Sequence, residues 1–61
     1  MNPTSLIVAR FLAVHGVPDM ADMPNTDAIT AFCWSEFNQV PSEHLAIKVR
    51  AALLALAKER R

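Results

Sequence analysis

The sequence contains a single cysteine and a single glycine among its 61 residues. One cysteine excludes a disulfide bond within the chain, and an unpaired thiol suits a reducing compartment. One glycine cannot build a glycine-rich loop that cradles phosphates, so a nucleotide-binding motif of that kind is excluded. A chain this short buries only a modest fraction of its surface, and it therefore needs a very well packed core or an oligomer to be stable.

Metal-ligating side chains are equally scarce. A zinc site needs about four Cys, His or carboxylate ligands at close spacing, and Cys33, His15 and His44 are not spaced in that way. Asp19 and Asp22 follow His15 near the first loop, but three such residues near a turn often occur by chance. We therefore expect no bound metal and no cofactor.

No pair of residues meets the requirements of a catalytic nucleophile and its base. Cys33 lies on an apolar stripe with Phe32 and Phe37, where burial raises the pKa of a thiol, so we expect a packed structural cysteine. Ser42 and His44 stand at the start of an expected helix, where their ordinary roles are a helix cap and an exposed side chain. With no acid–base pair and too little chain to enclose a substrate, we expect that the protein is not an enzyme.

Long hydrophobic runs are missing as well. No stretch approaches the roughly 20 apolar residues that a membrane-spanning helix requires. The apolar stretch from Leu6 to Val14 has no basic region before it and contains Arg10, so it is a poor fit to a signal peptide. We therefore expect a cytoplasmic protein with no membrane span.

What the sequence has instead is a helix-forming composition. Hydrophobic residues make up 52% of the chain, and the apolar set is dominated by Ala, Leu, Val and Met, a composition in which Ala, Leu and Met favour helices. Prolines and the capping residues beside them divide the chain into three expected helices, over about 3–15, 26–39 and 43–59. The expected fold class is therefore all-α: a single domain, residues 1–61, built as a compact three-helix unit.

The expected helices carry more apolar surface than one packing face needs. Helix 3–15 is apolar on nearly every side, and the run Ala51–Ala57 gives helix 43–59 an excess of apolar perimeter. A helix that is apolar all round is normally buried on more than one side. We therefore expect a helical homodimer, with an interface formed by Leu6, Ile7, Phe11, Val14, Ile47 and Leu54.

Three further apolar residues are candidates for binding a partner protein. In helix 26–39, Trp34 lies well off the core stripe, which runs through Ile29, Phe32, Cys33, Phe37 and Val40. Met20 and Met23 stand in a loop marked by two prolines. The structural interpretation is that Trp34 covers the edge of the bundle and the methionines fold back over the core. The functional interpretation is that all three are contacts for a partner.

The formal charge of the chain is zero, but the charge is unevenly distributed. Residues 1–40 carry one basic and four acidic residues, a net charge of −3, and residues 41–61 carry five basic and two acidic residues, a net charge of +3. One interpretation is that each helix end carries the sign that its macrodipole prefers. The other is that the two halves form a polar, head-to-tail recognition surface.

These features favour a small protein-binding adaptor or modulator, of the kind that phages and mobile elements use to inhibit or regulate a larger partner protein. One alternative is a small dimeric helix-turn-helix DNA-binding regulator, in which His44, Lys48 and Arg50 would contact DNA. The neutral charge argues against this alternative, because a basic surface is the expected footprint of DNA binding. A second alternative is a structural subunit of a larger assembly, with no activity of its own.

Overall fold

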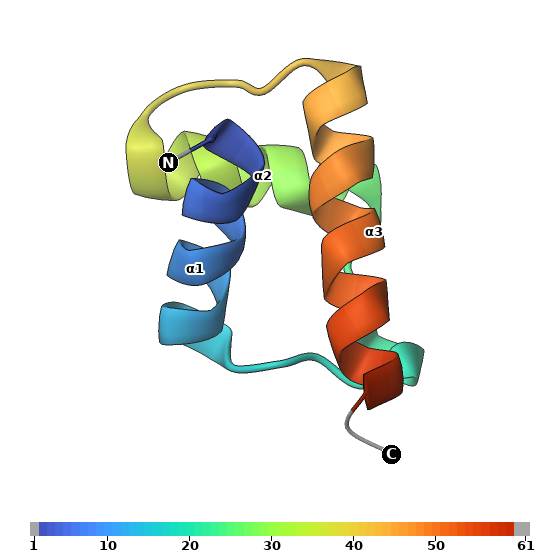
Figure 1. The fold of residues 1–61 in the computed structure, drawn as a ribbon. Helices are drawn as coiled ribbons and strands as arrows, with labels where there is room; N and C mark the ends of the chain where they lie inside the picture. Colours follow the sequence, from blue (N-terminus) through green and yellow to red (C-terminus); the bar gives the residue numbers. More distant parts are fainter. Residues whose placement is uncertain (1, 60–61) are drawn as a thin grey trace.

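The computed structural model describes residues 2–59, and these form three α-helices and one short 3-10 turn. The helices are α1 (Pro3–His15), α2 (Thr26–Phe37) and α3 (Glu43–Glu59), and the turn η1 (Met20–Asp22) lies between α1 and α2. No strand occurs among these residues, so the predicted all-α fold with three helices is confirmed. α1 and α3 run side by side in the same direction, and α2 crosses behind them (Figure 1).

Each helix begins after a residue whose side chain caps it. The Asn2 Oδ1 accepts a hydrogen bond from the backbone N–H of Ser5 at 2.8 Å, and the Asn25 Oδ1 accepts one from Ala28 at 2.8 Å. The Ser42 Oγ accepts the equivalent bond at the start of α3, at 3.1 Å. These bonds satisfy backbone N–H groups that have no carbonyl partner within the first turn of a helix.

α2 ends two residues earlier than predicted, at Phe37 and not at Gln39. Asn38 adopts the left-handed conformation, with φ of 58° and ψ of 34°, and its backbone N–H donates to the Trp34 carbonyl. Asparagine tolerates this conformation better than most residues do. The chain therefore leaves the helix at Asn38 and crosses to α3 through residues 39–42.

All three helices contribute side chains to one core. The residues that are less than a tenth exposed are Ile7, Phe11, Ile29, Cys33, Ala46, Val49, Leu53 and Ala57. Val49 and Leu53, one turn apart on α3, have no exposed surface. Within residues 2–59, no polar or charged side chain is buried. In the same range, no helix combines the length and the apolar character needed to cross a bilayer.

Two residues that were predicted for the dimer interface belong to this core. Ile7 is 7% exposed and Phe11 is 8% exposed, because both lie on the side of α1 that packs against the rest of the chain. Packing within a single copy covers most of the surface of both side chains. Whether they also contact a second copy stays a prediction.

Candidate functional site

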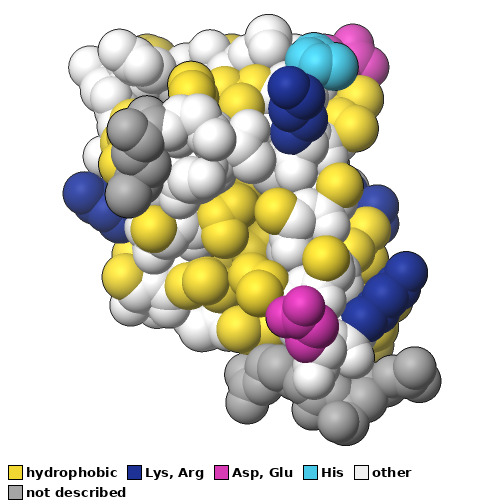
Figure 2. Space-filling model, viewed as in Figure 1, with side chains coloured by type: hydrophobic (Ala, Val, Ile, Leu, Met, Phe, Trp, Pro, Cys, Tyr) yellow, Lys and Arg dark blue, Asp and Glu magenta, His cyan; other side chains and the backbone are white. Residues whose placement is uncertain are grey.

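Large apolar side chains remain on the surface of the folded chain. Figure 2 shows hydrophobic side chains gathered over the region between α1 and α3. Within residues 2–59, the large hydrophobic residues that are about half exposed or more are Leu6, Val14, Met20, Trp34, Val40 and Ile47. Exposed apolar patches on a small protein mark interaction sites, so the shape of the surface around these residues is the guide to function.

The first candidate site is an open groove where α1 begins and α2 ends. Its volume is about 450 Å³, and no Asp, Glu, Lys, Arg or His lines it. The lining of this apolar groove consists of Pro3, Leu6, Ile7, Cys33, Phe37, Gln39, Val40, Pro41, Ser42 and Leu45. Leu6 is 49% exposed and Val40 is 65% exposed, so the groove opens to solvent between two apolar side chains.

The early end of α2 accounts for the exposure of Val40. The helical periodicity predicted Val40 on the core stripe, in line with Cys33 and Phe37. Because the helix stops at Phe37, Val40 lies in the connection to α3 and leaves the core, so that prediction is wrong. Pro41 follows it and favours an extended backbone at Val40. Sequence analysis missed this residue as part of a site.

Cys33 forms part of the floor of the apolar groove and is 2% exposed. Burial raises the pKa of the Cys33 thiol, as predicted from its place on the apolar stripe. The thiol is therefore neutral at physiological pH and packs as a small apolar group. The Cys33 side chain therefore helps to shape the groove and is not a reactive nucleophile.

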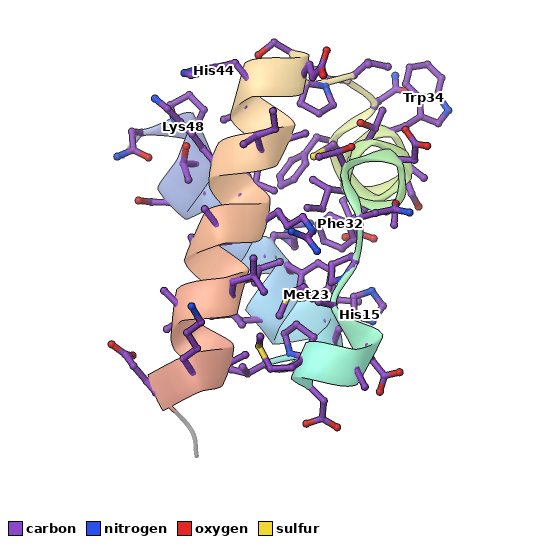
Figure 3. All side chains as sticks on the ribbon, turned by 90° about the vertical axis from the view of Figure 1, so that its right-hand side faces the viewer. His15, Met23, Phe32, Trp34, His44 and Lys48 are labelled. Carbon is purple, nitrogen blue, oxygen red and sulfur yellow. The ribbon has the colours of Figure 1, made fainter. Side chains whose placement is uncertain are left out.

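A second groove lies between the C-terminal half of α1, the connection after it, and α2. Its volume is about 770 Å³, and it is lined by Phe11, Val14, His15, Val17, Pro18, Asp19, Asp22, Pro24, Ala28, Ala31, Phe32, Ser35 and Glu36. The rings of Phe11, His15 and Phe32 pack together, with centroids 4.9 to 5.7 Å apart. Figure 3 shows His15 and Phe32 between α2 and η1. We call this the acidic groove, after the three carboxylates in its lining.

The carboxylates of the acidic groove differ in their partners. Glu36 forms an ion pair with Arg10, with 3.3 Å between Oε1 and Nη1. The Arg10 guanidinium also lies 5.2 Å from the centre of the Phe37 ring. Asp19 and Asp22 are exposed, and no residue within 2–59 forms an ion pair with either of them. The rim therefore carries two unpaired negative charges beside an aromatic floor.

The three predicted partner-binding residues do not come together. Trp34 is 57% exposed, which confirms that it lies off the core stripe, and Met20 is 50% exposed. Met23 is half-buried and packs against the core, as the lid interpretation predicted. Figure 3 shows Trp34 and Met23 well apart. None of the three lines either groove.

The structure distributes the predicted dimer residues over three surfaces. Leu6 and Ile7 line the apolar groove, and Phe11 and Val14 line the acidic groove. The remaining two, Ile47 and Leu54, are seven residues apart on one stripe of α3; Ile47 is 51% exposed and Leu54 is half-buried. The predicted interface therefore stays a prediction, with its residues divided among the apolar groove, the acidic groove and α3.

The predicted DNA-contacting residues also lie on different sides of α3. His44 and Lys48 are one turn apart and point the same way (Figure 3). Arg50 follows His44 by six residues, which places it about 240° further around the helix. Its Nε donates to the Pro24 carbonyl at 3.1 Å, on the side of α3 that faces the α1–α2 connection. The three side chains therefore do not share one face of α3.

The two grooves present different kinds of surface. The apolar groove presents uncharged surface, and the acidic groove combines aromatic rings with carboxylates. In the part of the chain that the structure describes, no three His, Cys, Asp or Glu side chains are placed to hold a metal ion. No protein-family model matches this sequence, and no curated protein or solved structure is significantly similar to it.

Proposed function

We propose that this chain is a small non-enzymatic protein that binds a larger partner protein through the apolar groove and thereby modulates that partner. The observation that carries the proposal is a groove of about 450 Å³ that opens to solvent and has no charged residue in its lining. Burying apolar surface contributes about 25 cal/mol per Å². A partner that covers Leu6 and Val40 therefore gains binding free energy from residues that the chain leaves exposed.

The groove favours an apolar anchor on the partner. One wall is the first turns of α1, and the other is the connection between α2 and α3. Gln39 is the lining residue with a free polar group, since the Ser42 hydroxyl already caps α3. A leucine, phenylalanine or methionine side chain inserted from the partner would be desolvated on several sides, which is the typical setting of a binding hot spot.

The test is a co-purification experiment with charged substitutions in the groove. The groove variant carries Leu6→Asp and Val40→Asp, and the matched control carries Ala9→Asp and Ala55→Asp, which are exposed and line neither groove. We expect one protein to co-purify stoichiometrically with the tagged wild type and the control, and not with the groove variant. Calorimetry and an activity assay with the purified partner then measure affinity and the direction of modulation. Circular dichroism checks that both variants remain helical.

A partner that is retained by the groove variant, or lost equally by the control, would contradict the proposal. The same preparations test the alternatives. A DNA-binding regulator predicts that wild type binds labelled duplex DNA, that Lys48→Ala weakens binding, and that affinity falls steeply with salt. A subunit of a larger assembly predicts that the isolated chain is poorly soluble.

A further inference from the structure

The acidic groove places two requirements on anything that fills it. Its floor is apolar, with the Phe11 and Phe32 rings 5.1 Å apart and Val14 half exposed at its edge. Its rim carries Asp19 and Asp22, which lose hydration when the groove is covered. An apolar occupant satisfies the floor, and positive charges beside it offset the desolvation of the carboxylates. The occupant that fits both features best therefore combines apolar side chains with Lys or Arg.

One surface of this chain meets both requirements. Ile47 and Leu54 lie on one stripe of α3, two turns apart, and Lys58 continues the stripe one turn later. Arg50 lies beside this stripe, one turn from both Ile47 and Leu54. We call these four residues the α3 edge. It begins one turn after Glu43, the acidic residue that suits the helix start.

The charges of the two surfaces match in number. The α3 edge carries two positive charges, on Arg50 and Lys58. The acidic groove carries two negative charges that have no ion-pair partner among residues 2–59, on Asp19 and Asp22, since Glu36 is paired with Arg10. The negatively charged first part of the sequence and the positively charged last part therefore contribute two surfaces of opposite charge to the folded chain.

The two surfaces also lie on opposite sides of one short segment. Arg50 in the α3 edge donates to the carbonyl of Pro24, and Pro24 together with Asp22 lines the acidic groove. Figure 3 shows α3, η1 and the His15–Phe32 region in one view, with η1 beside both. A two-fold axis close to this segment can therefore place each α3 edge over the acidic groove of the other copy.

We propose that the chain forms a closed homodimer in which the acidic groove of each copy receives the α3 edge of its partner. The proposal goes beyond the partner-binding function, because the acidic groove and the apolar groove share no lining residue. It also gives the function a consequence: the dimer leaves both apolar grooves open. A larger protein with two binding sites would then be bound with increased avidity.

The test is a charge exchange between the two surfaces, followed by light scattering after size exclusion. Variant one carries Asp19→Lys and Asp22→Lys, which makes its groove basic. Variant two carries Ala51→Glu and Lys58→Glu, which makes the α3 edge acidic; Ala51 is exposed and adjoins that edge. A control with Ala9→Lys and Glu59→Lys alters the net charge by a similar amount outside both surfaces. Circular dichroism verifies that every variant is folded.

We expect wild type and the control to approach twice the 6.7 kDa chain mass as concentration rises. Each charge variant alone remains at the mass of one chain, because its groove and edge then carry the same sign. An equimolar mixture of the two variants recovers the dimer mass, since both contacts are again between opposite charges. About 0.5 M salt weakens the wild-type dimer by screening these charges.

Three results would overturn the proposal: a wild type that stays monomeric at every concentration, charge variants that dimerise as well as wild type, or a mass that keeps growing past the dimer. Recovery must appear in the mixture and not in either variant alone. The partner-binding function has a separate readout in the Leu6 and Val40 variant. A monomer that still loses its partner on that change would end the dimer proposal and leave the function intact.

Discussion

Replacing Leu53 by alanine measures how much of the stability depends on the buried stripe of α3. Leu53 has no exposed surface. Truncating a buried leucine costs about 2.7–5 kcal/mol, because transfer free energy is lost and a cavity remains. A domain of 61 residues has a free energy of unfolding of roughly 3–9 kcal/mol, at about 0.05–0.15 kcal/mol per residue. We therefore expect this substitution to remove from about a third to all of the stability.

The matched control is the neighbouring residue. Leu54→Ala makes the same chemical change with the same effect on helix propensity, but Leu54 is half-buried and faces away from the centre of the core. We expect it to cost less than half as much as Leu53→Ala. Urea unfolding followed by circular dichroism at 222 nm gives both values. Equal losses would show that α3 packs on a different stripe, and the core described above would be refuted.

Varying the protein concentration tests whether Leu54 lies in the dimer contact. If Leu54 lies in the dimer contact, the wild type gains stability from association as concentration rises, and Leu54→Ala gains less. The difference in free energy of unfolding between the wild type and Leu54→Ala should therefore increase over a hundredfold range of protein concentration. The loss of unfolding free energy in Leu53→Ala arises in the core of each copy, so it should be present at every protein concentration. A Leu54→Ala difference that is constant over this range would argue against its place in the interface.

Three further predictions concern local features of the chain. Asn38 has a left-handed backbone, so Asn38→Ala should lower the free energy of unfolding by about 1 kcal/mol, and Asn38→Gly should not; equal melting temperatures for the two variants would contradict this. Asn25→Ala removes the cap of α2 and should cost about 1 kcal/mol in urea unfolding, whereas no loss would show that the cap bond contributes nothing. Burial raises the pKa of the Cys33 thiol, so the unfolded chain loses that proton at a lower pH than the folded chain does. Stability should therefore fall as the pH rises above the ordinary thiol pKa of about 8.5, and a fall that persists in Cys33→Ala would rule out this cause.

Helix starts were predictable because their signals are local. The caps Asn2 and Ser42 each act on a backbone N–H three residues away, so the sequence alone contains the interaction. The end of α2 was not predictable in the same way. Its apolar rhythm continues to Val40, and only the left-handed backbone of Asn38 stops it. Asparagine also occurs inside helices, so this residue is a weak stop signal without the path that the chain takes to α3.

The grooves could not be predicted for the same reason, because they depend on contacts between residues that lie far apart in the sequence. Periodicity identified α1 as apolar on nearly every side, but it did not show which side packs against the core and which side faces a groove. In the structure, Ile7 and Phe11 face the core, Leu6 faces the apolar groove and Val14 faces the acidic groove. α1 is therefore a wall of both grooves at once. The surplus of apolar residues that predicted one interface is divided among the two grooves and the stripe of α3 that contains Ile47 and Leu54.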